Sequence, residues 1–214
     1  MHITHLGHSA LLVELAGRRI LIDPGNFSTA WHGVTDLDAI CVTHLHPDHV
    51  DPTQVPALIA ANPQALVYVE PQVLDTVELA GALPIAADTS IELGGVTVTA
   101  VERVHPGRSS DIPRIGNVGL VVTAEGEPTL FHPGDALEAI PSGVDVLAVP
   151  AYGPWAAMKE TIDFVRAVGA PQGFLIHEGL LAERGWALAF NRMNELTPTT
   201  LIDLRTAGAW QPWS

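Results

Sequence analysis

The chain has 214 residues, of which 47% are hydrophobic, and its formal net charge is −14, from 24 acidic and 10 basic residues. This apolar content predicts a folded chain with a sizeable core rather than a disordered one. The excess of carboxylates argues against nucleic acid and against an anionic membrane surface as partners, because both are bound mainly through lysine and arginine.

The amino-terminal segment and the single cysteine bear on where the protein works. Residues 1–5 lack the charged and then apolar layout of a signal peptide, and no uninterrupted apolar stretch is long enough to span a bilayer. Cys41 has no second cysteine with which to form an internal disulfide. We therefore expect a cytoplasmic protein that acts on a small molecule, and exposed apolar edges would be compatible with a homo-oligomer.

Short apolar segments broken by glycine, proline and aspartate run along the whole chain and predict many short strands. In the first half we expect, in chain order, a hairpin of strands 11–14 and 19–23, a strand at 38–43, a helix at 52–61, a strand at 65–69 and a helix at 71–81. In the second half we expect a strand at 96–104, a hairpin of strands 118–123 and 129–132, a strand at 144–149, a helix at 156–168, a strand at 173–176, a helix at 180–196 and a strand at 200–204. Hairpins followed by strand–helix alternation, occurring twice, predict two β-sheets with helices outside them. We expect one domain, residues 1–214, built from two similar halves.

The segment His44-Leu45-His46-Pro47-Asp48-His49 places three imidazoles and a carboxylate within six positions, directly after a predicted strand. Further along, His105, Asp135 and His177 each lie where an apolar strand gives way to a turn. Strand ends hold functional side chains rigidly and leave them open to substrate. The pattern therefore predicts a metal site assembled from several strand ends.

The residue types favour a catalytic metal site over a structural one. Imidazole suits Zn, Fe and Mn, and a carboxylate can bridge two such ions. Cysteine ligands are absent from the set, and a histidine–aspartate site with a free coordination position can hold water. Metal-bound water ionises near neutral pH and becomes a nucleophile.

The 44–49 segment resembles the His-x-His-x-Asp-His signature of the metallo-β-lactamase superfamily. The flanking segments 6–10, 21–25 and 132–135 are also similar, in the family's order. Segments 6–10 and 149–153 look most like the small metal-dependent hydrolase branch that includes ascorbate-6-phosphate lactonases. The resemblance implies an α/β fold of the four-layer αβ/βα sandwich type.

The resemblance also implies two divalent metal ions, with Zn as the first expectation and Mn or Fe as alternatives. His44, His46 and His105 would ligate one ion, and Asp48, His49 and His177 the other. Asp135 would bridge the two ions together with a hydroxide, and Asp48 and Asp135 are the expected catalytic carboxylates.

Four further residues are candidates for supporting the ligands or contacting substrate. The resemblance places Asp23 close to the metal centre, where it would support a ligand, although Asp23 could simply start a turn. His8 and His132 would support the site or line the pocket, and Trp155 would form a pocket wall or an ordinary packed turn. Lys159, Arg103, Arg108 and Arg114 are alternative anchors for an anionic substrate, and the sequence does not choose among them.

The predicted function is a dinuclear metal-dependent hydrolase that uses a metal-bound hydroxide on a lactone or ester, with a phosphodiester as the second choice. One alternative is an iron-dependent redox protein on the same scaffold. The other is a metal-binding regulator without catalysis.

Overall fold

The computed structural model describes residues 1–101, 104–107 and 111–213. Two seven-stranded sheets form its centre. The first sheet has the spatial order β14 (Ala209–Trp210), β1 (His2–His5), β2 (Leu11–Leu15), β3 (Arg18–Ile22), β4 (Ala39–Val42), β5 (Leu66–Val69) and β6 (Leu83–Pro84). The second has the order β13 (Thr200–Ile202), β12 (Gln172–Ile176), β11 (Val146–Pro150), β10 (Leu130–His132), β9 (Gly119–Ala124), β8 (Val96–Val101) and β7 (Ser90–Glu92).

Both sheets change from antiparallel to parallel pairing in the same way. Strands β1, β2 and β3 pair antiparallel, and β3 to β6 pair parallel. Likewise β7 to β10 pair antiparallel, and β10 to β13 pair parallel. The parallel strands of each sheet therefore end together at one edge, which is where the predicted ligands follow them.

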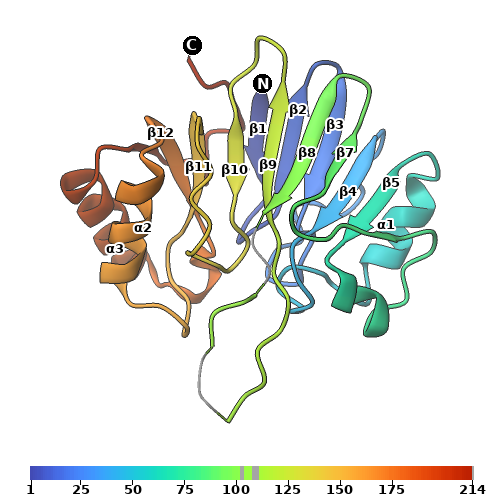
Figure 1. Ribbon diagram of the computed structural model, residues 1–214, viewed down its shortest axis with the longest axis horizontal. Coiled ribbons are helices and arrows are strands. Elements are labelled where there is room, and N and C mark those ends of the chain that lie inside the picture. The colour runs from blue at the N-terminus through green and yellow to red at the C-terminus, as the bar shows by residue number, and fades with distance from the viewer. Residues whose placement is uncertain (102–103, 108–110, 214) are drawn as a thin grey trace.

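Side chains that alternate along the strands build three apolar layers. On β4, Ala39 and Cys41 face the other sheet, whereas Ile40 and Val42 belong to a second cluster that includes Val55 of α1 (Val55–Ala61). The outer side of the second sheet packs against α2 (Met158–Val168) and α3 (Glu183–Leu196). Figure 1 shows α1 on one side of the strands and α2 and α3 on the opposite side. The expected four-layer sandwich of helix, sheet, sheet and helix is confirmed.

Three predicted helices differ in extent from the observed ones. The helix expected at 71–81 is only a 3₁₀-helix, η1 (Pro71–Asp75), because the backbone leaves helical geometry at Thr76 (φ −122°), whose hydroxyl donates to the carbonyl of Gln72. A β-branched residue loses side-chain freedom in a helix, which favours this early end. The helix at 52–61 begins only at Val55, since the Asp51 carboxylate accepts hydrogen bonds from the amides of residues 53 and 54.

The helix expected at 180–196 is divided in two. A 3₁₀-helix, η2 (Glu178–Leu180), comes first, and α3 follows after an extended Leu181 (φ −98°, ψ 133°). Strands β1, β6, β7 and β14 were not predicted. They have two to four residues each, too few for a periodic pattern to show.

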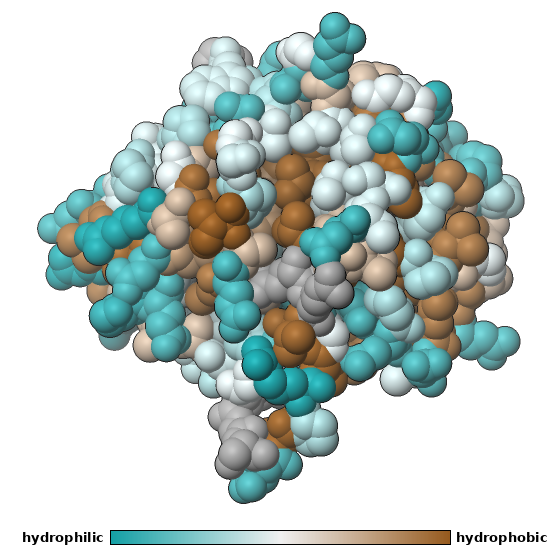
Figure 2. Space-filling view, viewed as in Figure 1, coloured by the Kyte–Doolittle hydropathy of each residue, from teal (hydrophilic) through white to brown (hydrophobic). Residues whose placement is uncertain are grey.

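Hydrophobic side chains on the face seen in Figure 2 lie in several patches between hydrophilic ones, as on an ordinary protein surface. Among the described residues, no helix combines the length and the apolar character needed to cross a membrane.

Candidate metal centre

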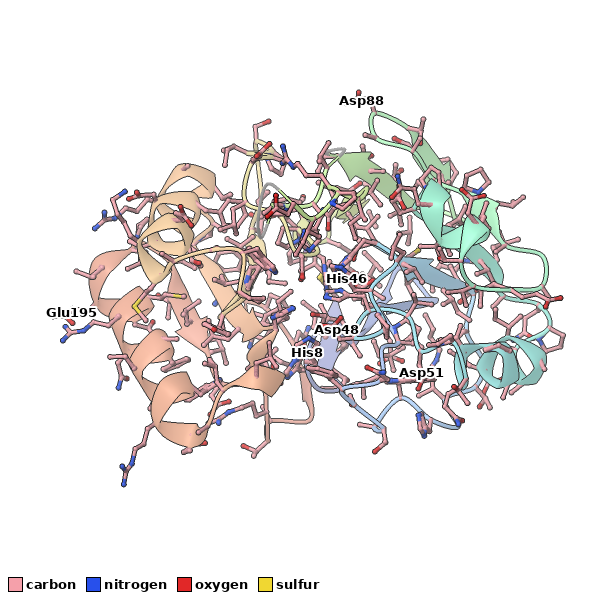
Figure 3. The ribbon with its side chains drawn as sticks, turned by 90° about the horizontal axis from the view of Figure 1, so that it is seen from below. His8, His46, Asp48, Asp51, Asp88 and Glu195 are labelled. Carbon is pink, nitrogen blue, oxygen red and sulfur yellow. The ribbon has the colours of Figure 1, made fainter. Side chains whose placement is uncertain are left out.

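The seven predicted ligands converge at the edge where the parallel strands end. His44 follows β4, Asp135 follows β10 and His177 follows β12. His105 follows β8 of the second sheet, four residues after its last residue, Val101. In the view of Figure 3, the labelled His46 and Asp48 lie in the middle of the molecule, between its two sides. The carboxyl ends of parallel strands are the usual site for ligands in such sheets.

Two groups of side chains are close enough to hold one ion each. Within each group, one donor atom per residue lies within 4.8 Å of the others. The first group is His44, His46, His105 and Asp135; the second is His8, Asp48, His49 and His177. Asp135 also reaches the second group, because its Oδ1 is 3.0 Å from His49 Nε2 and its Oδ2 is 3.2 Å from His177 Nε2. Its carboxylate thus lies between both groups, where a bridging ligand would be.

Backbone acceptors fix the orientation of two of the imidazoles. His105 Nδ1 is 2.6 Å from the carbonyl oxygen of Pro106, and His177 Nδ1 contacts the carbonyl oxygen of Tyr152. A carbonyl can only accept, so each neutral ring carries its proton on Nδ1. The Nε2 lone pair of each ring then faces the centre.

Asp23 and Thr43 orient two more imidazoles. The Asp23 Oδ2 atom accepts from His49 Nδ1 at 2.7 Å and from the Thr43 hydroxyl at 2.7 Å. Since the hydroxyl proton is used in this way, the Thr43 oxygen accepts from His44 Nδ1, 3.1 Å away. His44 and His49 therefore also present Nε2 lone pairs to the centre. Hydrogen bonds of this type to the outer nitrogen are a regular feature of metal-binding histidines.

Three buried ligand atoms at the centre, His49 Nε2, His177 Nε2 and Asp135 Oδ1, make no well-directed hydrogen bond among the described residues, although His49 Nε2 and Asp135 Oδ1 are only 3.0 Å apart. Buried polar atoms without partners are rare, because each one costs free energy. A cation between them would satisfy all three, and imidazole with carboxylate is a donor set that suits Zn, Mn and Fe. The residues present therefore fit one or two divalent ions.

The pKa values of the predicted ligands are those of a site that would release protons when a metal ion binds. Burial lowers the pKa of His44 well below its ordinary value, which keeps the ring neutral. Burial opposes ionisation of Asp135, but the charges of His49 and His177 hold the pKa of this carboxyl well below its usual range. Despite burial, Asp135 and Asp23 raise the pKa of His49 well above its ordinary value. In the metal-free protein, the protonated His49 imidazole thus supplies positive charge next to Asp135, where a metal cation would otherwise do so.

His8 differs from the other rings because its Nδ1 atom accepts rather than donates. The amide of Gly179 donates to His8 Nδ1 at 3.2 Å, and a Cβ on Gly179 would lie 2.9 Å from that atom. The proton of the neutral ring is therefore on Nε2, which donates to Asp48 Oδ2 at 3.1 Å. With no lone pair left for a metal, His8 is placed to orient Asp48.

His132 is fully buried and holds two segments together. Its Nδ1 accepts from the amide of Gly134 at 3.1 Å, and its Nε2 donates to the carbonyl of Ser9 at 3.0 Å. Because both ring nitrogens are used and the ring is buried, His132 is not available to contact substrate. Its position is that of a residue that supports the turn before Asp135.

Sequence reasoning missed two supporting residues. Asn117 is fully buried, its Oδ1 accepts from the amide of Asp135 at 3.0 Å, and its Nδ2 donates to Pro133. No motif marks this asparagine in one sequence. Thr43 directly precedes the histidine cluster, and that position is the signal that could have identified it.

A cleft of about 400 Å³ opens beside the ligands. It is lined by Asn26, Phe27, His46, Pro47, Asp48, Asp135, Pro154, Trp155, His177 and Leu180. Trp155 lies in this wall, as expected, and its indole Nε1 donates to Asp135 Oδ2 at 3.0 Å. A Cβ on Gly153 would lie 2.2 Å from the Trp155 ring, so only glycine at 153 allows the turn to fold the indole back onto the site.

The structure does not place the described candidate anchors for an anionic substrate, Lys159 and Arg114, side by side at the cleft. Lys159 is exposed and pairs with Asp163, one helical turn along α2. Arg114 donates from Nε to the carbonyl of His105 at 3.1 Å and lies 3.6 Å from Glu138. Arg103 and Arg108 lie outside the described residues.

Comparison with known proteins agrees with this geometry. Residues 2–172 match the family model of the β-lactamase superfamily domain. Protein Rv0786c of Mycobacterium tuberculosis is 39% identical over 207 residues, which span 93% of this chain and 94% of the relative. A UPF0173 metal-dependent hydrolase of Azorhizobium caulinodans is 36% identical over 152 residues, which span 63% of each chain.

Solved structures support the same fold. The metallo-β-lactamase fold protein YhfI of Bacillus subtilis superposes with a TM-score of 0.71 at 16% identity, over 98% of both chains. The expected resemblance is thereby confirmed at the level of the superfamily, whereas the ascorbate-6-phosphate lactonase branch stays a prediction. The chain belongs to the metallo-β-lactamase superfamily and is one of its metal-dependent hydrolases.

Proposed function

We propose that the protein is a dinuclear metal hydrolase that opens a lactone or ester bond of a small molecule. The observation that carries this proposal is the set of Nε2 atoms and carboxylate oxygens that converge beside an open cleft, three of them without a well-directed hydrogen bond among the described residues. Two divalent ions bound there would lower the pKa of a shared water and polarise the carbonyl of the substrate.

The protein's own residues would hold and orient this centre. His44, His46 and His105 would hold one ion, with Asp135 between it and the second. The carbonyl and carboxylate acceptors behind the rings prevent rotation, so the donor atoms are set before the substrate arrives.

The second ion would be held by Asp48, His49 and His177. Asp48 is the more accessible carboxylate of the two predicted to be catalytic, with 18% of its side chain exposed against 2% for Asp135. Asp48 can therefore meet substrate at the cleft, whereas Asp135 is confined to holding the centre together. The alkoxide released from the ester would take up the proton carried by the attacking hydroxide, on the open side of the centre next to Asp48.

Metal content and activity test the proposal together. The purified protein is analysed for bound elements and screened, with added Zn or Mn, against esters, lactones and phosphodiesters. We expect two ions per chain and hydrolysis of an ester or lactone, and we expect Asp135→Ala to lose both. Asp163→Ala, an exposed carboxylate on α2, is the matched control and should retain both.

The outcome separates the proposal from its alternatives. Full activity in the metal-depleted protein would refute the metal mechanism. Redox-active iron with an optical signature would favour the redox alternative. Two bound ions with no turnover of any substrate class would favour a regulator without catalysis.

A further inference from the structure

The mouth of the cleft is built from apolar side chains that remain open to solvent. Phe27 and Leu180 are each 48% exposed, although both are large hydrophobic residues. Pro154 and Trp155 line the same cleft, on the side where the indole reaches Asp135. Exposed apolar side chains gathered around a concave site are a regular sign of a ligand surface.

Contacts with the ligand-bearing segments fix this apolar rim in place. The Phe27 ring centroid is 4.8 Å from that of His8, and a Cβ on Gly179 would lie 3.2 Å from Phe27. The preceding residue, Asn26, donates its amide to the carbonyl of Pro47, inside the histidine cluster. Phe27 is thus tied to the same loops that hold the ligands.

Leu180 is tied to the site from the other half of the chain. It ends η2, which begins one residue after His177. The amide of the next residue, Leu181, bonds back to the carbonyl of Glu178 at 2.8 Å, which closes this short turn. Phe27 and Leu180 line the same cleft as Asp48 and Asp135, so a group that lies against them shares this cleft with the proposed centre.

Charge around the cleft disfavours an anionic substrate group. The described lining residues include two carboxylates, Asp48 and Asp135, and neither lysine nor arginine. Lys159 is paired with Asp163, and Arg114 lies 3.6 Å from Glu138. Arg114 lines a separate, smaller cavity on the side of His46 and His105, and is not among the residues that line the cleft with Phe27 and Leu180. Asp48 and Asp135 would be neutralised by the ions proposed above, but the rim around Phe27 and Leu180 has no described lysine or arginine. A phosphate or carboxylate that lies against this rim, away from the ions, would lose hydration without a cationic side chain to replace it.

We propose that the substrate is an uncharged ester or lactone that carries an alkyl or aryl group, and that this group packs on Phe27, Leu180 and Trp155. This inference rests on the proposed function, because it assigns a substrate class to the same site. It narrows the lactone or ester expected from the sequence to an uncharged one, and it disfavours the phosphodiester that was the second choice.

Matched substrates test the charge and the apolar contact separately. The zinc-loaded protein is assayed with 4-nitrophenyl acetate, butyrate and octanoate, and with mono-4-nitrophenyl succinate, in which a carboxylate replaces the terminal methyl group of the butyrate. We expect kcat/KM to rise about twofold to fourfold per methylene up to the length of the cleft. The succinate should fall below the butyrate by about tenfold or more, as expected when a charge is desolvated without a partner.

Variants assign the effect to the rim. Phe27→Ala and Leu180→Ala should flatten the dependence on chain length, because kcat/KM for the octanoate should fall by a larger factor than kcat/KM for the acetate. Leu188→Ala is the matched control, since Leu188 is 53% exposed on α3 and is not among the described lining residues. Thermal unfolding verifies that each variant folds; both rim side chains are half exposed, so their loss should cost little stability.

Binding of alkyl hydroxamates keeps the inference separate from the choice of bond. Suppose that no ester is hydrolysed, that octanohydroxamate binds the zinc-loaded protein more tightly than acetohydroxamate, and that Leu180→Ala removes this difference. That result would support binding of the alkyl group at the apolar rim and would refute the proposed ester hydrolysis. Equal affinities for both hydroxamates, or a higher kcat/KM for the succinate than for the butyrate, would overturn the inference.

Discussion

Asp23 offers the sharpest test of how the centre is held, because it touches a predicted ligand and no substrate. Its side chain is fully buried, and it accepts three hydrogen bonds, from His49 Nδ1 at 2.7 Å, the Thr43 hydroxyl at 2.7 Å and the Thr43 amide at 2.8 Å. Asp23→Asn keeps the shape of the side chain but replaces one accepting oxygen with a donating NH₂. The backbone at Asp23 has φ +50°, a conformation that asparagine tolerates, so the substitution adds no backbone strain.

The expected size follows from which atom is replaced. If the amide oxygen faces His49, the NH₂ group meets the Thr43 amide, and two donors oppose each other. If the amide is flipped, the NH₂ group faces His49 Nδ1, and the ring must carry its proton on Nε2, where the metal should bind. Either way a buried group loses its partner, which costs about 1–3 kcal/mol of stability. Loss of a partner behind a metal ligand typically weakens metal binding by about 10- to 100-fold.

The assay is competition for zinc with a chelating dye, together with urea unfolding of the metal-free protein. Asp51→Asn is the matched control. The Asp51 side chain also accepts backbone amides, at 2.8 Å and 3.2 Å, but from its Oδ1 alone and in the turn that precedes α1. The oxygen of an asparagine side chain can accept both bonds there. If Asp23→Asn loses stability but binds zinc as tightly as the unmodified protein, Asp23 supports the fold and not the ligand His49.

Three further expectations concern the same centre. Trp155→Phe removes the hydrogen bond to Asp135 and should lower kcat/KM by about tenfold, with metal content by elemental analysis unchanged; a loss of metal instead would contradict this role. His8→Phe removes the donor to Asp48 and should reduce the ions bound at limiting zinc from two towards one, and an unchanged count would contradict it. Burial lowers the pKa of His177, but Asp135 and Asp48 raise it to about 9, above its ordinary 6.5. In the metal-free protein this ion pairing should stabilise the fold fully below pH ~6.5 and be lost as pH rises through ~9, and a melting temperature independent of pH between 7 and 10 would refute it.

The ligands could be predicted from sequence because their signal is local. His44, His46, Asp48 and His49 lie within one turn, and His105, Asp135 and His177 each follow an apolar strand of recognisable period. Strand ends meet at one edge whatever the exact bounds of the strands, so errors of two or three residues do not move the site. The paired sheets and outer helices follow from the same alternation.

Other parts of the molecule depend on contacts that one sequence does not show. The end of η1 depends on the Thr76 hydroxyl, which donates a hydrogen bond to the carbonyl of Gln72, four residues earlier. The division before α3 depends on the positions that the site requires of His177 and of Gly179, whose amide donates to His8. In both places the local pattern favours a longer helix, and tertiary contacts override it. The support by Asn117 is of this kind too, since its partner lies eighteen residues further along.

Backbone strain gives a physical reason to regard His8, Asp23 and His177 as one functional unit. All three are non-glycine residues with positive φ, at +55°, +50° and +57°. Each such residue costs roughly 1 kcal/mol or more, and the cost persists only where surrounding contacts over-determine the conformation. Here those contacts are hydrogen bonds to the metal-ligating loops: His8 to Asp48, Asp23 to His49, and His177 to Tyr152. Glycine at His8 or Asp23, which support ligands without being ligands themselves, would relieve the strain but remove the hydrogen bond. Either variant, if it gains stability while losing zinc affinity, would show that the native residue lowers the stability of the fold in order to hold the centre.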